Sequence, residues 1–219
     1  MNRFEKMFES DALLVPARKP RATLKAAPEF RGPKELILSG YCTPVENQGA
    51  KPWCAAYAAT SFAENLRWRI DGYHRDIDPA PVYAYAKSVD GAPDVDGTYL
   101  ECALRGIMAG GHLPDTCGVR TFSSLRDLKY AIHRYGVCVA GFNVTSDWFE
   151  ARNGVILGSG EKRGGHAVTV CGYDEGGVLI LNSWGRDWGR GGFAYLPNRA
   201  FDDQFIYGAA LSGVFAGDI

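Results

Sequence analysis

The sequence lacks any run of apolar residues long enough to cross a membrane. Its 219 residues are 46% hydrophobic, but no stretch approaches the roughly 18 consecutive apolar residues that a membrane-spanning helix needs. Near the N-terminus, the segment 11–15 (DALLV) is too short for the apolar core of a signal peptide. We therefore expect no membrane span, and a location in the cytoplasm or one reached without a cleavable signal peptide.

The chain also lacks an excess of charge of either sign. It has 24 Lys and Arg residues against 25 Asp and Glu residues, which leaves a net charge of -1. A nucleic-acid-binding surface is usually strongly basic, because it neutralises phosphates. We therefore expect no nucleic acid partner.

The sequence also has no CxxC pair of cysteines. The six are Cys42, Cys54, Cys102, Cys117, Cys138 and Cys171. Their scatter argues against a structural zinc site, and nothing in the sequence indicates another metal or a cofactor. Without a secretion signal we expect reduced thiols, with a Cys102–Cys117 disulfide as the alternative.

Composition divides the chain into an arm and a folded domain. Residues 1–35 are rich in Lys, Arg, Pro and Glu without a sustained period, which predicts an extended or partly disordered arm. We expect a single compact domain over 36–219, and a monomer. Its helical lobe is predicted at about 50–125 and its β lobe at about 130–219.

Helical periodicity dominates the first lobe. The Ala-rich segment 54–70 predicts a helix, which should be buried because its first half is small and apolar nearly all round. Its apolar positions recur every four residues, at Ala58, Phe62, Leu66 and Ile70. Further helices are predicted over 81–88, 99–109 and 124–135.

After Gly136 the sequence consists of short β-rich runs separated by glycine-containing turns. They are GVCVAGFNV, HAVTVCGY, GVLILNSW, GFAYLP and YGAALSGVF. A helical half followed by a strand-rich half predicts an α+β fold with two lobes.

Cys54 is the candidate nucleophile. It opens the predicted helix, where free backbone N–H groups and the helix dipole favour an anion. A thiol becomes a good nucleophile when it is held as the thiolate. We therefore predict that Cys54 alone among the six cysteines is a thiolate near neutral pH.

His166 and Asn182 are the candidate partners of that thiol. His166 stands at the predicted start of the strand AVTVCGY, and Asn182 ends VLILN sixteen residues later. Two adjacent antiparallel strands would bring them together, so the amide oxygen can orient the ring. Gln48 lies six residues before Cys54, and its amide can donate to an oxyanion together with the Cys54 N–H.

Three segments resemble the papain-like cysteine peptidases. They are TPVENQGAKPWCAAYA (43–58), GGHAVTVCGYD (164–174) and NSWGRDWGRGGF (182–193), in the family's order and spacing. The resemblance covers about 36–215. It implies a two-lobed fold with Cys54 on the helical lobe and His166 on the β lobe, and a catalytic set of Cys54, His166, Asn182 and Gln48. It implies no cofactor.

The same resemblance suggests four substrate-binding residues: Gly97, Ala140, Gly165 and Trp184. Gly97, in DGTYLECAL, matches the segment that binds the substrate backbone as an extended strand. Ala140 falls where the main specificity pocket is lined. Trp184 matches the tryptophan that shields the His–Asn hydrogen bond from water.

The nucleophile segment departs from the family pattern. Lys51 stands where the family has a cysteine, so the usual first disulfide cannot form, and Ala55 replaces an aromatic residue. The Cys–His separation of 112 residues is short, and the arm is too short for the family's large inhibitory propeptide. These departures suggest an atypical branch, and we expect a bacterial one.

The sequence thus predicts a peptidase that hydrolyses peptide or isopeptide bonds in a polypeptide through a thioester on Cys54. Two alternatives remain. The same residues can perform acyl transfer or deamidation, although relatives of that kind usually carry Asp where Asn182 stands. An inactive binding module is disfavoured because Cys54, His166 and Gln48 are all present.

Overall fold

The computed structural model describes residues 23–42 and 44–214. Five α-helices occur in them: α1 (Cys54–Asp71), α2 (Pro79–Val89), α3 (Leu100–Ala109), α4 (Leu125–Tyr135) and α5 (Asn198–Gln204). The strands are β1 (Leu36–Ile37), β2 (Gly118–Phe122), β3 (Cys138–Thr145), β4 (Lys162–Tyr173), β5 (Gly177–Leu181), β6 (Phe193–Pro197) and β7 (Phe205–Ser212). Short 3-10 turns are η2 (Ser39–Tyr41), η3 (Ser146–Phe149) and η4 (Arg152–Gly154).

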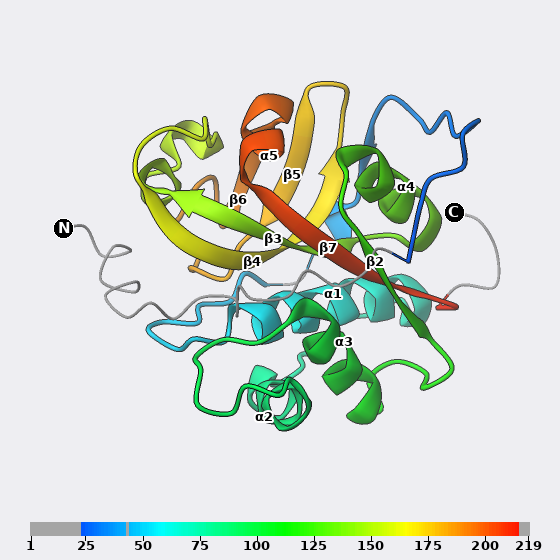
Figure 1. The fold of residues 1–219 in the computed structure, drawn as a ribbon. Coiled ribbons are helices and arrows are strands. Elements are labelled where there is room, and N and C mark those ends of the chain that lie inside the picture. The colour runs from blue at the N-terminus through cyan, green and yellow to red at the C-terminus, as the bar shows by residue number, and fades with distance from the viewer. Residues whose placement is uncertain (1–22, 43, 215–219) are drawn as a thin grey trace.

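The strands form one antiparallel sheet in the upper half of the molecule as drawn in Figure 1. Their order is β2-β7-β3-β4-β5-β6, and β1 pairs with β4 off this path. The central pair β3 and β4 runs in register from Cys138 opposite Val170 to Val144 opposite Gly164. The long strand β4 therefore connects the middle of the sheet to the helical half below it.

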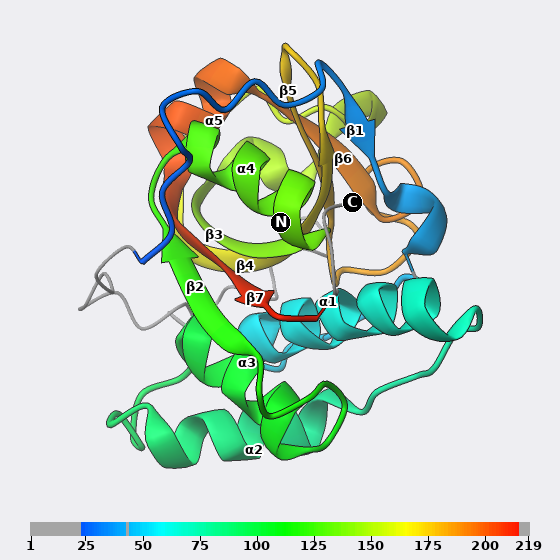
Figure 2. The ribbon, with the colours of Figure 1, turned by 90° about the vertical axis from the view of Figure 1, so that its right-hand side faces the viewer.

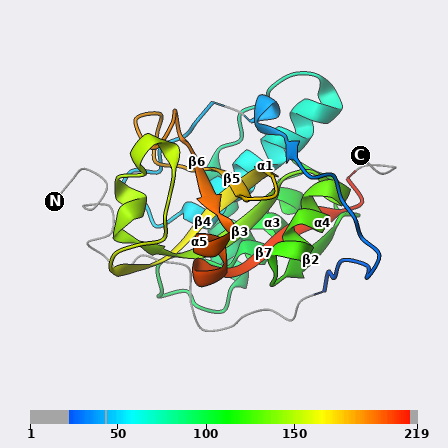
Figure 3. The same cartoon turned by 90° about the horizontal axis from the view of Figure 1, so that it is seen from above.

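Helix α1 lies between the sheet and the pair α2 and α3 (Figure 1). All residues from Cys54 to Leu66 are buried, as the apolar composition of this half predicts. Thr169 of β4 donates to the carbonyl of Ala58 at 2.9 Å, which fixes the helix against the strand. Seen from above, β3, β4 and β7 lie over α1 and α3 (Figure 3).

Burial ends before the outer end of α1. Ile70, the last position in the period of four, is exposed. The helix has by then run past the sheet, and it ends where Gly72 adopts a left-handed conformation with φ of 78°.

Helices α4 and α5 pack on the β lobe rather than with the other helices. Figure 2 shows α4 within the curve of the strands. Phe201 of α5 stacks on Phe205 of β7 with ring centroids 4.4 Å apart, and both rings contact Phe142 of β3. The molecule therefore has an aromatic core in the β lobe and an alanine-rich core around α1.

The four helices predicted from periodicity are confirmed, with ends within two residues of those expected. Three elements were not predicted from the sequence, namely β1, β2 and α5. His166 was expected at a strand start, but it is the fifth residue of β4 and pairs with Phe142. The strand begins earlier than expected because Gly164 and Gly165 take part in the pairing instead of ending it.

Part of the predicted arm lies within the described residues. From residue 23 to 35 the chain runs beside β2 and α4: Leu24 is buried, and the Ala26 N–H donates to Asp127 at 2.8 Å. Residues 1–22 of the arm and 215–219 of the predicted domain lie outside the described residues. Within the described chain, no helix combines the length and the apolar character that crossing a bilayer requires.

Candidate active site

Cys54 is the first residue of α1, and only 2% of its surface is exposed. Three backbone N–H groups lie near enough to the thiol to lower its pKa: those of Ala167, Ala55 and Cys54 itself. Two come from the open start of the helix, where N–H groups have no partner within the helix. The third follows His166 directly in the chain, so β4 brings His166 beside the nucleophile.

His166 and Asn182 meet because β4 and β5 pair antiparallel, with Thr169 opposite Leu181. The Nε2 atom of His166 lies 2.8 Å from the Oδ1 atom of Asn182. The backbone N–H of Ser183 donates to the same Oδ1 atom at 2.8 Å, which identifies that atom as the amide oxygen. His166 therefore carries its proton on Nε2, and Nδ1 is left as the basic nitrogen.

Aromatic rings enclose this hydrogen bond. The Trp184 ring lies 4.7 Å from the His166 ring between centroids, and Trp148 approaches it edge-on at 6.4 Å. Phe149 stacks on Trp184 at 5.6 Å. Because His166 and Trp184 are each 1% exposed, the hydrogen bond is kept out of water, which strengthens it.

Gln48 is attached to the residue that follows Asn182. Its backbone N–H donates to the carbonyl of Ser183 at 2.9 Å, and the Ser183 hydroxyl donates to its Oε1 atom at 2.7 Å. The Nε2 atom donates to the carbonyl of Lys51 at 2.9 Å. An amide nitrogen has two hydrogens, so the second is left for an oxyanion.

Neighbouring backbone contacts extend this attachment. The Gly185 N–H donates to the carbonyl of Glu46 at 2.8 Å, and Asn47 forms an isolated antiparallel bridge with Trp184. We call the paired residues 46–48 and 183–185 the inter-lobe bridge. It joins the segment leading into Cys54 to the segment leaving Asn182, and so brings the four predicted catalytic residues into one region.

Burial acts on the pKa of both groups. It raises the pKa of Cys54 to about 11, more than the three N–H groups lower it. It also lowers the pKa of His166 to about 4, against the hydrogen bond to Asn182. Desolvation therefore opposes the thiolate that the helix start favours, and it opposes an imidazolium as well. The thiolate stays a prediction.

The four substrate-binding candidates differ in their exposure. Gly165 is partly exposed beside His166. Ala140 is 0% exposed in the middle of β3, so it does not fit the lining of an open pocket. Trp184 shields the His–Asn bond, and its burial likewise leaves no face for a substrate. Gly97 precedes α3 and is buried as well, so its contact with a substrate stays a prediction.

Three carboxylates gather beside the inter-lobe bridge. Single oxygens of Glu46, Glu64 and Asp76 lie within 4.8 Å of one another, a donor set that hard cations accept. One Glu64 oxygen accepts a hydrogen bond from the Ile77 N–H at 2.7 Å. Burial and the neighbouring acids raise the pKa of Glu46 to about 8, so a proton on Glu46 relieves the repulsion at neutral pH.

Two residues of the site were missed from the sequence. Ser183 anchors Gln48, and its place between Asn182 and Trp184 could have drawn attention to it. Trp148 reaches His166 from η3, and no spacing in the sequence signals that contact. All six cysteines are free thiols, including Cys102 and Cys117.

Known proteins resemble this chain in sequence. The family described as "Papain family cysteine protease" matches residues 101–206, which include His166 and Asn182. Papain of Carica papaya is 27% identical over 200 residues, covering 80% of this chain and 57% of papain. A cathepsin B-like cysteine proteinase of Caenorhabditis elegans is 35% identical over 101 residues, covering 44% of this chain and 27% of that protein. The chain thus spans little more than half, or less, of these relatives.

Solved structures share the fold. Procathepsin L 3 of Tenebrio molitor superposes with a TM-score of 0.71 at 15% identity, covering 96% of this chain and 79% of that one. Xylellain, a cysteine protease from Xylella fastidiosa, gives a TM-score of 0.63 at 17% identity, covering 92% and 100%. The α+β papain-like fold expected from the sequence is confirmed. In sequence the chain is thus similar to the papain family over residues 101–206, and in structure it has the papain-like fold.

Proposed function

We propose that the protein is a cysteine peptidase that hydrolyses peptide bonds in a polypeptide substrate. The inter-lobe bridge is the observation that carries the proposal. It fixes Gln48 and the approach to Cys54 against the residues that follow Asn182. A nucleophile, an oriented base and an amide donor then face one reacting carbonyl.

The reaction begins with attack by the Cys54 sulfur on the scissile carbonyl carbon. The thiol proton passes to Nδ1 of His166, because burial disfavours a thiolate that has no partner. The carbonyl oxygen becomes an oxyanion, which accepts from the Cys54 N–H and the second Nε2 hydrogen of Gln48. Asn182 holds the ring by accepting from Nε2.

Collapse of this intermediate breaks the carbon–nitrogen bond. His166 gives its proton to the leaving amine, and the acyl group stays on Cys54 as a thioester. Water then attacks the thioester while His166 takes one of its protons. The acid leaves, the proton returns to sulfur, and the neutral pair is restored.

The test is cleavage of a panel of fluorogenic peptides by the wild-type protein and by Cys54→Ala. We expect cleavage only by the wild type, with new peptide N-termini seen by mass spectrometry. Deamidated or amine-linked products without chain cleavage would instead indicate acyl transfer. Turnover by Cys54→Ala would contradict the assignment of the nucleophile.

A peptidyl epoxide provides an independent readout of the site. We expect it to label Cys54, and His166→Ala to remove the labelling. Cys42 is the matched control, because it is the partly exposed thiol and a simple alkylator can reach it. Cys42→Ser should be labelled by the epoxide as the wild type is.

A further inference from the structure

The Trp148 ring, which approaches His166 from η3, is fastened to the end of α5. Trp148 is buried, and its Nε1 atom donates to the Oε1 atom of Gln204 at 2.8 Å. Gln204 is the last residue of α5 and is buried as well. A buried indole N–H and a buried amide each cost free energy unless they are hydrogen-bonded. This bond therefore favours one position of the indole.

The Gln204 amide is itself held by a chain of hydrogen bonds. Its Nε2 atom donates to the Thr145 hydroxyl at 2.8 Å, and that hydroxyl donates to Oδ1 of Asp147 at 2.5 Å. The other carboxylate oxygen, Oδ2, accepts the backbone N–H groups of residues 157–159 at 2.9 to 3.1 Å. An indole nitrogen can only donate, so Gln204 must face it with its oxygen, and each later bond then has one possible direction.

The backbone of Trp148 is fixed to the other wall of the site. Its carbonyl accepts from Nε1 of Trp188 at 2.6 Å, and the Trp188 ring meets Trp184 edge-on at 5.5 Å between centroids. Phe142, which pairs with His166 across β3 and β4, contacts the Trp148 ring at 5.8 Å. The indole is therefore held at its N–H, its face and its backbone, with its edge toward the imidazole.

We propose that Gln204 is a positioning residue for His166: by holding the Trp148 indole, it keeps water away from the imidazole and from its bond to Asn182. Thr145 supports Gln204 in this role. Water competes for hydrogen bonds and hydrates charges, so an opened wall would weaken the bond to Asn182 and ease protonation of the ring. The proposal rests on the proposed peptidase function, in which a neutral His166 accepts the thiol proton.

Titration of the His166 ring, followed by NMR, tests this role. Cys54→Ala is the parent of all variants, so that the thiol does not titrate together with the ring. In the parent we expect the ring to titrate near the pKa of about 4 that burial imposes. Gln204→Met removes both amide bonds at a similar side-chain size, so the midpoint should rise by about one pH unit, toward the ordinary 6.5. Exchange of the His166 Nε2 proton with water should accelerate at least about tenfold.

Thr145→Val is the second variant, and it decides the matter if Gln204→Met does not fold. It exchanges a hydroxyl for a methyl group and leaves the bond between Trp148 and Gln204 in place. The amide then has no acceptor for its Nε2 hydrogen, so its hold on the indole is weaker. We expect the midpoint of the His166 titration to rise in this variant too, by less than in Gln204→Met.

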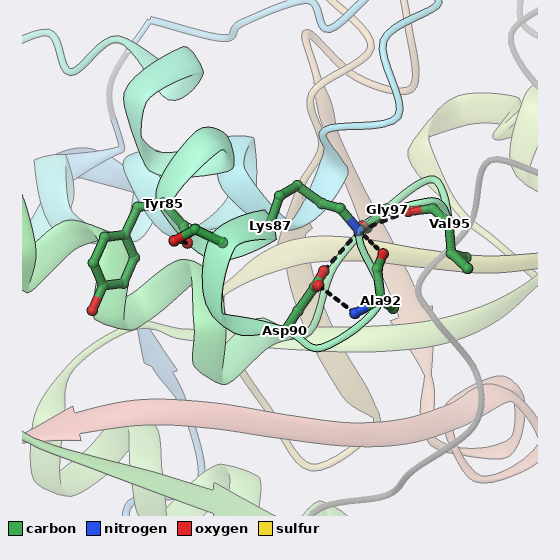
Figure 4. Close-up of polar contacts among 7 residues, drawn as sticks. Tyr85, Lys87, Asp90, Ala92, Val95 and Gly97 are labelled. Carbon is green, nitrogen blue, oxygen red and sulfur yellow. Dashed lines mark hydrogen bonds and ion pairs between the residues drawn. The ribbon is translucent and has the colours of Figure 1, made fainter.

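A polar cluster in the helical lobe provides the matched control. The Lys87 ammonium contacts the Asp90 carboxylate at 2.8 Å and donates to three backbone carbonyls within 92–97, at 2.5, 2.7 and 3.2 Å (Figure 4). These charge-assisted bonds hold the segment between α2 and α3 and come from residues other than those that enclose the imidazole. Lys87→Met should therefore lower Tm but leave the His166 titration and the Nε2 proton exchange unchanged.

The outcomes separate this proposal from the proposed function. An unchanged titration in the folded Gln204 and Thr145 variants would overturn the positioning role. An equal rise in Lys87→Met would overturn it too, because general loosening would then explain the effect. With Cys54 present, the acid limb of kcat/KM should move up in Gln204→Met as the titration does. If the wild type cleaves no peptide, the proposed function fails, while the titration still reports whether Gln204 keeps water from the ring.

Discussion

The two sides of the active site are built differently. His166 lies on β4, and Asn182 directly follows the paired strand β5, so the register of this strand pair sets their distance. Cys54 and Gln48 are joined by an irregular loop, whose shape depends on the inter-lobe bridge and on Trp53 stacking against Tyr83. One side is positioned by local regularity, and the other by contacts between parts of the chain far apart in sequence.

The family match divides along the same line. The matched family region, 101–206, contains the histidine side and excludes the nucleophile side. The departures from the family pattern, Lys51 and Ala55, are on the nucleophile side as well. A strand pair tolerates little change in register, whereas a loop held by side-chain contacts can exchange one set of contacts for another.

The largest expected effect comes from the histidine side. His166→Ala removes the group that accepts the thiol proton, so peptide turnover should fall by about 10⁴-fold. Because burial disfavours the free thiolate, Cys54 should also lose reactivity toward iodoacetamide near neutral pH. His112→Ala, outside the site, serves as control. Unchanged alkylation in His166→Ala would show that the thiol ionises without the imidazole.

Next in size is the effect of the oxyanion donor. Gln48→Ala should lower kcat by about 10²- to 10³-fold, as expected for one lost donor, while alkylation stays near the wild-type rate. Ser183→Ala keeps the amide and removes its anchor, so a fall of about three- to tenfold is expected. If Gln48→Ala depressed alkylation as strongly as His166→Ala, Gln48 would instead shape the environment of the thiol.

A smaller effect is expected for Asn182, measured through pH. Catalysis needs a neutral His166, so kcat/KM should fall on its acid side near the His166 pKa of about 4. The bond to Asn182 raises that pKa, and Asn182→Ala should therefore move the acid limb to still lower pH, with about a tenfold loss of turnover at neutral pH. An acid limb that stays in place would show that Asn182 does not govern the ring's proton.

The smallest effect concerns stability on the nucleophile side. The folded pKa of Glu46, about 8, exceeds the ordinary value of 4.5. The folded state therefore holds more protons between these values, and Glu46 should make the protein less stable as pH rises from about 5 to 8. Glu46→Gln should remove this loss and raise Tm at pH 8.5 by about 2–4 °C for each 1 kcal/mol regained.

Thermal unfolding at pH 5 provides the control, because Glu46 is protonated there in the folded state and Glu46→Gln should then differ little from the wild type. A Tm gain equal at both pH values would mean that the substitution acts through packing and not through charge. His166→Ala unfolding at both pH values would show whether the histidine side shares this dependence, which we do not expect.

The sequence by itself determined the elements and the order of the chemical groups. The period of four in 54–70 specified a helix with Cys54 at its start, and the β-rich runs specified the strand that carries His166 and the strand that Asn182 follows. These are local properties: apolar spacing selects helix or strand, and adjacent strands pair. The three family-like segments supplied the roles, including that of Gln48.

Tertiary structure alone decided the burial of the site and the contacts between lobes. The start of α1 favours a thiolate, yet β4 and the aromatic rings bury Cys54 and His166, and burial opposes a charge on either group. Ser183, which holds Gln48, joins residues that no short-range pattern relates. Desolvation and long-range hydrogen bonds depend on what packs around a residue, and that information is absent from its own segment of sequence.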